Sequence, residues 1–283
     1  YMMERRIRRK KVDIQKENDN LIMQSKLQFF TDISHEIRTP LTLILSPIEA
    51  LIKETPEGPL QNVYKMINQN GQRILRLINQ VMEMRKLDRG QVRLLTVPTD
   101  VDTFFRAIAS SFDNIAEEKH IQFEIHVEPG LPTVWIDQEK LDKVVFNVLS
   151  NAFKYTPEGG KVTIEIGKDG GDLKIRIADS GEGVPAEQRE LIFNRFYQIP
   201  TKNNRNKMGT GIGLHLSRSL MEIHHGRIYV EDSSAGGAVF VVTLPLNNDY
   251  LKKEEMQTEA SEDSLATLVQ PALQDFVEEV QEE

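Results

Sequence analysis

The sequence predicts two folded parts: an all-α helical hairpin that pairs with a second copy as a dimeric four-helix bundle, and an α+β domain. Two stretches before residue 90 carry apolar residues at spacings of three and four, the period of a helix with one buried side. From Gln91 onward, short alternating runs separated by turns and helices indicate one mixed sheet covered by helices on one face. No run of eighteen apolar residues occurs, so we expect no membrane-spanning segment in this sequence.

The composition is typical of a globular protein with two modest domains. The 283 residues are 39% hydrophobic and contain no cysteine, which excludes disulfides and thiolate metal sites and suits a reducing compartment. The stretch from Lys252 to Glu283 holds ten acids and two lysines, which accounts for the whole net charge of −8. The part before it is therefore neutral overall, and we expect no direct nucleic-acid partner.

Residues 1–24 are predicted to form a helical arm. Six cations fall between Arg5 and Lys11, and Ile7, Ile14 and Leu21 follow a heptad apart. Such a cluster binds nucleic acid, forms a solvated helix face, or follows a transmembrane helix on the cytoplasmic side. We favour the third interpretation, in which a segment before Tyr1 anchors the parent protein at the cytoplasmic side of the inner membrane.

Residues 25–90 are predicted to form the hairpin, with one helix ending near Glu54, a turn at residues 55–59, and a second helix ending at Arg89-Gly90. A lone hairpin cannot bury two continuous apolar stripes, whereas two paired hairpins can, so we expect a homodimer. The stripes comprise Phe30, Ile33, Ile37, Leu41, Ile44, Ile48 and Leu51 in the first helix, and Val63, Ile67, Ile74, Leu77, Val81 and Met84 in the second.

His35 and Glu36 lie off the apolar side of the first helix. Neutral imidazole is a nucleophile near pH 7, and Glu36 can accept the proton of one ring nitrogen and so activate the other. Pro40 removes one backbone donor and should bend the helix just past His35. The alternative is an exposed helix histidine with an ion-pair neighbour.

Residues 91–248 are predicted to form the α+β domain, and residues 249–283 a mobile acidic tail or linker with a short amphipathic piece at residues 273–280. Within the domain we expect three helices: 101–119 capped by Asp100, one capped by Asp137 and reaching about Tyr155, and one ending at His224. The expected strands are 92–97, 121–127, 161–166, 173–179, 227–232 and 238–244.

Asn147, Asn151 and Lys154 share one face of the helix that follows Asp137. Amide oxygens suit a hard cation such as Mg²⁺, and a lysine one turn further suits the phosphates that the cation bridges. The alternative interpretation is a solvated helix side.

Two glycine-containing segments follow. Asp179 ends a strand before Ser180-Gly181-Glu182-Gly183, where its carboxylate can accept the exocyclic amine of a purine; a simple strand-ending turn would look similar. The basic run 201–208 leads into Gly209-Thr210-Gly211-Ile212-Gly213-Leu214, and glycines that open a helix expose amides to an anion. Taken singly, this pattern is weak evidence for nucleotide binding.

Taken together and in this order, the motifs resemble those of the sensor histidine kinases. The H, N, G1, F and G2 boxes of that family are matched by residues 35–40, 147–156, 179–183, 193–196 and 209–213. The resemblance covers roughly residues 20 to 246, and it implies a Bergerat-type ATP-binding sandwich after the hairpin.

The resemblance also implies site residues. It makes His35 the phosphoacceptor, Glu36 its base and Asn151 a Mg²⁺ ligand with Asn147 nearby. It places Lys154 and Tyr155 near the phosphates of ATP, Asp179 on adenine, and Gly209, Gly211 and Gly213 at a lid. We add Gly181, Gly183, Arg195 and Leu214 to the expected nucleotide site.

The resulting hypothesis is a kinase that phosphorylates His35 and passes the group to the aspartate of a response-regulator receiver domain. The rivals are an ATP-driven clamp of the gyrase or chaperone type and a silent dimerisation scaffold. The amino-acid sequence around His35 also resembles that of the hybrid subgroup, in which sensor, kinase and receiver share one chain.

Thr39 lies one helical turn after His35, so its hydroxyl can orient a water against a receiver phosphoaspartate. Many members of the family are bifunctional, which supports a phosphatase role. The alternative is that Thr39 only satisfies a backbone group at the bend before Pro40.

Overall fold

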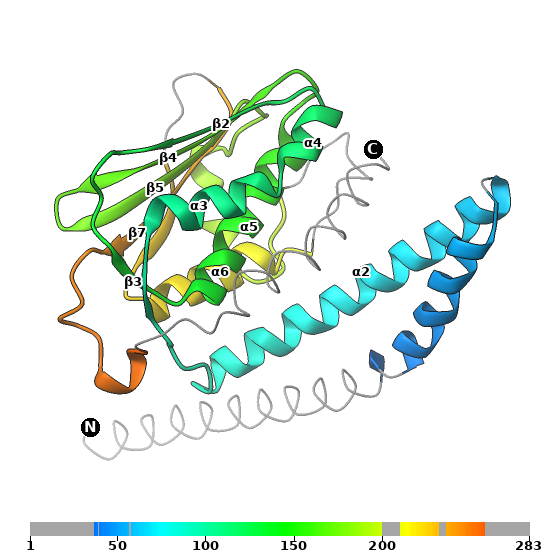
Figure 1. The fold of residues 1–283 in the computed structure, drawn as a ribbon, viewed down its shortest axis with the longest axis horizontal. Helices are drawn as coiled ribbons and strands as arrows, with labels where there is room; N and C mark the ends of the chain where they lie inside the picture. Colours follow the sequence, from blue (N-terminus) through cyan, green and yellow to red (C-terminus); the bar gives the residue numbers. More distant parts are fainter. Residues whose placement is uncertain (1–36, 39, 57, 200–209, 232–235, 258–283) are drawn as a thin grey trace, which may run out of the picture. The chain divides into compact units, whose positions relative to one another are not determined.

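The computed structural model of the chain describes residues 37–38, 40–56, 58–199, 210–231 and 236–257 (Figure 1). These residues divide into two compact units at the junction between Asp88 and Arg89. The predicted arm and the predicted amphipathic piece at 273–280 lie outside the described residues. No helix in the described ranges is long and apolar enough to cross a membrane.

The first unit is an antiparallel pair of helices. Residues 40–54 form one helix, and α2, Pro59–Asp88, forms the other. Near the turn, the Gln61 amide donates to the carbonyl oxygens of Ile52 and Thr55, both at 3.1 Å. At the far end Nη2 of Arg38 donates to Oδ1 of Asn79 across 2.6 Å.

Much of the predicted apolar stripe is exposed within one copy of this unit. Ile44 is 54% exposed, and Val63 and Ile74 are 44% and 45% exposed, whereas Leu45 is 3% exposed. Leu45 fits against α2 at Gly71, where a Cβ atom would collide with its side chain. The hairpin therefore buries one side between its own helices and leaves a second apolar side open.

The second unit is built on a five-stranded mixed sheet in the order β2-β4-β5-β7-β6. β2 and β4 run parallel, and all other neighbours in this sheet run antiparallel. A separate antiparallel pair joins β1, Val97–Thr99, to β3, Val134–Ile136. The five strands are Gln122–Val127, Lys161–Asp169, Asp172–Asp179, Arg227–Glu231 and Val239–Pro245 for β2, β4, β5, β6 and β7.

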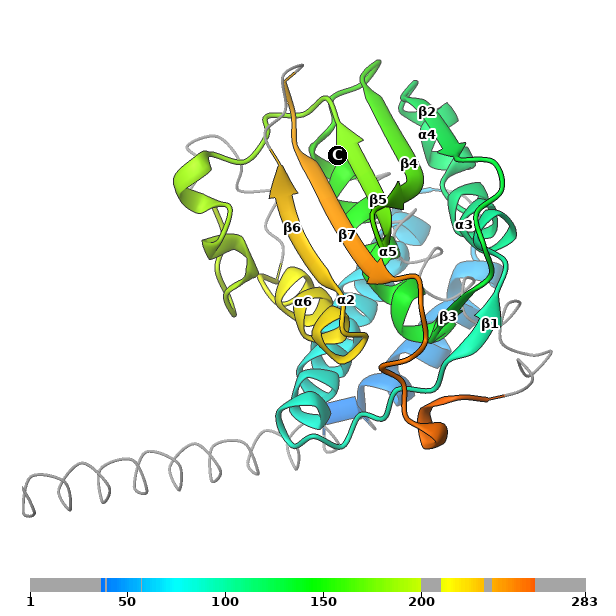
Figure 2. The ribbon, with the colours of Figure 1, turned by 90° about the vertical axis from the view of Figure 1, so that its left-hand side faces the viewer.

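Helices cover one face of this sheet, as Figure 2 shows with α5 and α6 behind the strands. Ile175 and Ile177 of β5 point to the helices and are at most 1% exposed, while Lys174 and Arg176, which alternate with them, point the other way. This arrangement confirms the predicted α+β layer. The four helices are Val101–Ser110, Asp113–Glu118, Gln138–Tyr155 and Gly213–Ile223 for α3, α4, α5 and α6.

The helix predicted over residues 101–119 is two helices, so that prediction was wrong in its length. Asp100 does cap α3, because its Oδ1 accepts from the Thr103 amide at 2.8 Å. The chain then breaks at Ser111-Phe112. The break lets Phe112, which is fully buried, stack on Phe153 of α5 with ring centroids 5.2 Å apart.

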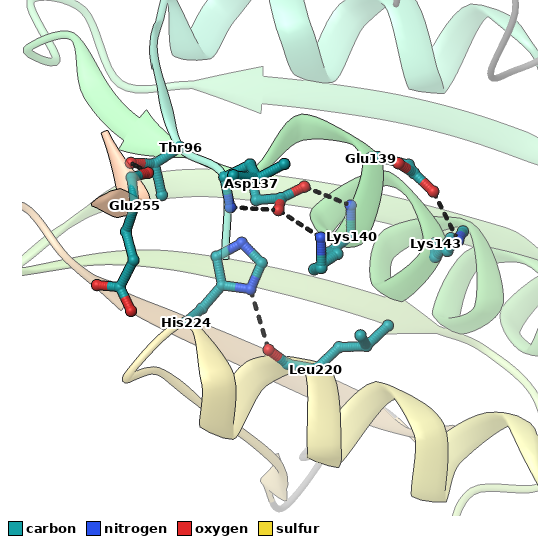
Figure 3. Close-up of polar contacts among 9 residues, drawn as sticks. Thr96, Asp137, Glu139, Lys140, Lys143, Leu220, His224 and Glu255 are labelled. Atoms are coloured by element: carbon teal, nitrogen blue, oxygen red, sulfur yellow. Dashed lines mark hydrogen bonds and ion pairs between the residues drawn. The ribbon is translucent and has the colours of Figure 1, made fainter. Parts of the chain in front are cut away.

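The strand predicted at 92–97 begins only at Val97, because β3 is three residues long and offers no partner to residues 92–95. Thr96 pairs elsewhere, with the segment that follows β7. Its amide and its hydroxyl both donate to the Glu255 carbonyl, at 2.6 and 2.8 Å (Figure 3). The Gln257 amide donates to Thr96 O at 2.9 Å. We call residues 246–257 the exit strap; it contains η3, Lys253–Glu255.

The exit strap corrects the prediction that the chain is a mobile tail from residue 249. Its position is fixed beside the start of α5, where Asp137 is the N-cap (Figure 3). Oδ2 of Asp137 accepts from the Leu95 amide at 2.9 Å and from Nζ of Lys140 at 2.6 Å. The segment that enters this unit, at Leu95 and Thr96, thus contacts the exit strap and the start of α5 at the same place.

Candidate functional site

The predicted polar residues lie along one side of α5. Val148, Leu149 and Ala152 are buried toward the sheet, whereas Asn147, Asn151 and Lys154 are half-buried on a second face of the helix. Tyr155, the last residue of α5, is 42% exposed. The structure therefore presents two amides and one amine in a row along α5.

Asn147 connects α5 to α6. Its amide nitrogen donates to Oγ of Ser217 across 2.9 Å, and Ser217 is 1% exposed. A Cβ atom on Gly213 would collide with the Asn147 amide, so glycine is required where α6 begins. Gly213, the last glycine of the predicted motif, thus allows the close approach of these two helices.

Asp179 lies at the end of β5 and is 8% exposed. One carboxylate oxygen, Oδ1, accepts from the amides of Gly181 at 2.8 Å and Ala238 at 3.2 Å. Burial raises the pKa of Asp179 above its usual range, and the two amide donors oppose that rise. These amides fix the carboxyl group through Oδ1, and the other oxygen, Oδ2, can accept a hydrogen bond from an amine.

Glycines pack backbone against backbone around Asp179. A Cβ on Gly181 would lie 2.5 Å from the Tyr155 carbonyl oxygen, and one on Gly183 would lie 2.6 Å from that of Gly237. Gly183 and Gly237 both have φ of +75°, in the left-handed region that favours glycine. These contacts bring the loop after β5 against the C-terminus of α5 and the start of β7.

The segment before residue 200 contacts the segment after residue 209. The Phe196 amide donates to the Gly211 carbonyl at 2.8 Å, and Gly211 has φ of +69°. A Cβ on Gly211 would meet the Phe196 backbone at 2.7 Å. The F-box and G2-box motifs are therefore adjacent in space. Gly209 and the basic run before it lie outside the described residues.

The first turn of α6 faces this junction. Gly213 and Leu214 open the helix, which has no side-chain N-cap and no acidic residue in its first turn. The positive end of the helix dipole at Gly213 and Leu214 therefore favours an anion.

Arg195 is held by His215 of α6. Nε of Arg195 lies 2.9 Å from Nε2 of His215, whose Nδ1 lies 3.1 Å from the Phe193 carbonyl oxygen. Phe193 ends η2, Leu191–Phe193, and is 1% exposed. The sequence predicted a role for Arg195 but not this partner.

Three further residues of the site were missed from the sequence: Gly237, Ala238 and Ser217. A pair of glycines immediately before a strand was the available signal for Gly237, because it resembles the pattern at Gly181 and Gly183. Ser217 and the Ala238 amide gave no signal, since their partners lie about 60 or more residues away.

The residues present fit a Mg²⁺-nucleotide. Among the described residues, no three His, Asp or Glu side chains gather in a way that could hold a metal ion. Mg²⁺ bound with a nucleotide needs only one or two protein ligands, since phosphate and water oxygens complete its octahedron. An amide oxygen on α5 meets that need. His35, Glu36 and Thr39 lie outside the described residues.

Two family models match the chain. The model described as His Kinase A (phospho-acceptor) domain matches residues 25–90. The model described as Histidine kinase-, DNA gyrase B-, and HSP90-like ATPase matches residues 136–248, which include Asn147, Asp179 and Gly213.

Relatives and solved structures that resemble this chain include histidine kinases. "Histidine kinase P4" of Formosa agariphila is 36% identical over 94% of this chain and 20% of its own length. "Sensor histidine kinase TmoS" of Ectopseudomonas mendocina is 38% identical over 79% of this chain and 23% of its own. The chain thus spans about a fifth of the length of these relatives. The solved structure of full-length ShkA in complex with AMPPNP has a TM-score of 0.66 and 29% identity, covering 77% of this chain and 45% of ShkA.

Proposed function

This chain belongs to the sensor histidine kinase family, and on that premise we propose that it transfers the γ-phosphoryl group of ATP to its own His35. A receiver-domain aspartate, in the same or another chain, then takes the group from His35. The observation that carries this proposal is Asp179, a buried carboxylate fixed through one oxygen and surrounded by closely packed glycine backbone.

ATP binding follows from the family, and the described residues supply its chemistry. Oδ2 of Asp179 accepts the exocyclic amine of adenine, and Gly181 and Gly183 let the backbone approach the flat ring. Lys154 and the first turn of α6, from Gly213, face the phosphates with positive charge and amide donors. ShkA, a solved relative, was captured with AMPPNP, an analogue of ATP.

Mg²⁺ is the metal we propose, with Asn151 as its protein ligand and Asn147 beside it. Bound there, the ion neutralises phosphate charge during transfer. The hydrogen bond from Asn147 to Ser217 uses the amide nitrogen, so it orients the amide oxygen of Asn147 toward the start of α6.

His35 is the proposed nucleophile and Glu36 its proton acceptor. The neutral imidazole attacks the γ-phosphorus while the β-phosphate oxygen leaves as ADP, and Glu36 takes the imidazole proton. Phosphoryl transfer otherwise requires positioning and charge neutralisation, which the second unit supplies.

A homodimer is the proposed state of the first unit. The open apolar side of the hairpin, with Ile44, Val63 and Ile74 each more than 40% exposed, is what a second copy would cover in a four-helix bundle. The phosphoacceptor family model matches the whole of that hairpin. Light scattering on the full chain should give twice the monomer mass.

Two features of the parent protein are also proposed. The cations between Arg5 and Lys11 suit the cytoplasmic flank of a membrane anchor, and the F-F-T-D-I-S-H-E sequence before Ile37 suits the hybrid subgroup. Both concern a longer parent protein, as in the relatives, of whose length this chain spans about a fifth.

The rival functions are disfavoured by the first unit and by the site. An ATP-driven clamp of the gyrase or chaperone type needs no phosphoacceptor hairpin, yet the His Kinase A model matches residues 25–90. A silent scaffold would have no use for Asp179, a buried carboxylate fixed through Oδ1 with Oδ2 placed to accept an amine.

Incubating the full chain with γ-labelled ATP and Mg²⁺ tests the proposal. The wild type should gain acid-labile phosphate, while His35→Gln should bind ATP with unchanged affinity and gain none. His126→Gln, an exposed change on the open sheet face, serves as the control and should label normally. Label that persists on His35→Gln, or that is stable to acid, contradicts the assignment.

A further inference from the structure

His224 is buried where α6 ends, close to where the chain enters and leaves the second unit. It is the C-cap of α6 and is 2% exposed. Figure 3 shows its ring directed toward Asp137, the N-cap of α5. Asp137 accepts from the Leu95 amide at 2.9 Å, and Thr96 bonds Glu255 of the exit strap. We call residues 95–96 together with the exit strap the junction.

The hydrogen bond of His224 defines where its ring carries a hydrogen. Nδ1 lies 3.0 Å from the Leu220 carbonyl oxygen, which only accepts, so Nδ1 donates. In the neutral ring Nε2 then has a lone pair and no hydrogen. Nε2 is buried and has no hydrogen-bond partner within the described part of the chain. A proton added to Nε2 would therefore create a charged ring with a buried, unpaired N–H.

The charged groups around His224 offer little compensation for that charge. From α5 they are the Asp137 carboxylate and Nζ of Lys140, which already pair with each other across 2.6 Å. The exit strap adds Glu255, whose carboxylate is already bonded to an amide within the strap. Residues 94–97 carry no titratable side chain. A protonated His224 would therefore compete with bonds that hold the junction closed.

The direction of the pKa of His224 agrees with this arrangement. Burial is the main cause, and it lowers the pKa from the ordinary value of 6.5. The Leu220 carbonyl and the charge of Asp137 oppose that decrease, whereas Lys140 reinforces it. The closed junction therefore favours the neutral ring.

The next residue, His225, connects the same end of α6 to the exit strap. Its φ is +56°, a conformation that glycine usually adopts after a helix. Its ring lies against Tyr250 of the strap, with ring centroids 5.0 Å apart. His225 is exposed, so of these two adjacent histidines only His224 is withdrawn from water.

We propose that His224 makes the junction sensitive to acid: its neutral ring stays buried in a closed junction, and its protonation favours a form in which residues 95–96 and the exit strap are released. Release lets water reach the ring and hydrate its charge. His224 lies at the opposite end of α6 from Gly213. The device is therefore separate from the proposed nucleotide site.

Acid should weaken the closed junction. Because the closed form has the lower pKa, its stability is complete above pH 6.5 and declines as the pH falls below that value. A released imidazole with the ordinary pKa raises the open population by up to about tenfold between pH 7.5 and pH 5.5. Asp142, whose raised pKa acts in the opposite direction, is common to all the proteins compared.

Amide hydrogen exchange of the full chain at pH 7.5 and pH 5.5 tests the proposal, with each rate corrected for intrinsic exchange at that pH. The reporters are the amides of Leu95, Thr96 and Gln257, which bond across the junction. Their opening should increase by up to about tenfold at the lower pH. The amides of Ile175 and Ile177 in β5 report unfolding of the sheet and should show no such increase.

Three variants assign the effect to one ring. In His224→Asn the amide nitrogen can replace Nδ1 and donate to the Leu220 carbonyl, but the side chain does not titrate, so opening should be equal at both pH values. His224→Phe also does not titrate, and it keeps the test informative if melting curves show that His224→Asn fails to fold. His225→Asn is the matched control, because asparagine tolerates a positive φ. It loses the ring contact with Tyr250 at both pH values alike and should keep the wild-type pH dependence.

Four outcomes would overturn the role of His224. They are equal opening of the wild type at both pH values, a pH dependence that persists in the His224 variants, and an increase of the same size in the β5 amides. The fourth is a His224 imidazole that titrates near pH 6.5 by NMR while the junction amides stay protected. Labelling of His35 plays no part in these measurements, so the kinase proposal is tested separately.

Discussion

The amide nitrogen of Asn147 on α5 donates a hydrogen bond to the hydroxyl oxygen of Ser217 on α6 across 2.9 Å. Ser217 is 1% exposed, so water cannot replace this acceptor. The bond thus fixes the spacing of the two helices that border the proposed nucleotide site.

Ser217→Ala should therefore lower both stability and nucleotide affinity. Losing a buried acceptor leaves the Asn147 amide without this partner, which costs about 1–2 kcal/mol of unfolding free energy. Urea unfolding and ATP titration measure the two effects. Ser219→Ala, at a half-buried position two residues further along α6, should change neither. Wild-type values for Ser217→Ala in both measurements would show that the bond does not fix the helices.

Asp179→Asn should abolish tight ATP binding while the fold is retained. The Asn oxygen can still accept from the Gly181 and Ala238 amides, but its NH₂ group then faces the adenine amine donor against donor. We expect at least a tenfold loss of ATP affinity by calorimetry, with a native melting curve. A guanine nucleotide, which presents an acceptor at that position, should not lose affinity to the same extent. Unchanged ATP affinity would make Asp179 a structural turn residue.

Asn151→Ala should remove the Mg²⁺-dependent part of ATP affinity. The amide oxygen has no substitute on α5 at that position, and the residue is half-buried, so the fold should survive. ATP titrations with Mg²⁺ and with EDTA should converge for the variant but differ for the wild type. Asn114→Ala, on the exposed side of α4, is the matched control. A variant that keeps the full Mg²⁺ effect would return Asn151 to a solvated helix side.

Asp142 on α5 makes the stability of this unit depend on pH. Burial raises its pKa from 3.8 to about 6, with Lys143 opposing that rise. A carboxyl group with a raised folded pKa favours folding most when it is protonated, below pH 3.8. Its contribution declines as the pH rises from 3.8 to 6 and is constant above that range.

Asp142→Asn should consequently stabilise the protein at pH 7.5, by up to about 3 kcal/mol, because the amide carries no charge to desolvate. The gain should shrink toward pH 4, where the wild-type carboxyl is protonated. Urea unfolding at the two pH values measures it, and the exposed Asp113→Asn should give no comparable gain. Equal effects of Asp142→Asn at both pH values would contradict the burial of an ionised group.

Thr39→Ala should slow removal of phosphate from a partner receiver and leave phosphorylation of His35 near normal. The reason is positional, since Thr39 follows His35 by one helical turn and its hydroxyl can orient the attacking water. Labelled phosphoreceiver, mixed with each protein in ADP, gives the dephosphorylation rate. Loss of both activities together, or unfolding of the hairpin, would make Thr39 a structural residue at the bend before Pro40.

The parts of the fold that sequence predicted are those set by local rules. Asp100 and Asp137 were recognised as helix caps, and each accepts the amide three residues on. The alternating strands were found because one face of the sheet is buried and the other is not.

The parts that sequence missed depend on distant partners. The break at Phe112 exists because Phe153, about 40 residues later, provides the surface on which its ring packs. Likewise, Thr96 bonds the exit strap instead of extending β1, and His215 bonds Arg195 on another element. Neither periodicity nor residue type identifies such a partner, which only the folded chain brings into contact.

The bonds between Thr96 and the exit strap also determine how this unit would carry tension. Force applied between the chain before Thr96 and the chain after Gln257 would act on the bonds that Thr96 makes with Glu255 and Gln257. The five strands of the large sheet lie outside that short path, so they would bear no load as long as the bonds of Thr96 remained intact. A pull on either flanking segment would thus be passed to the other and would leave the proposed nucleotide site undistorted.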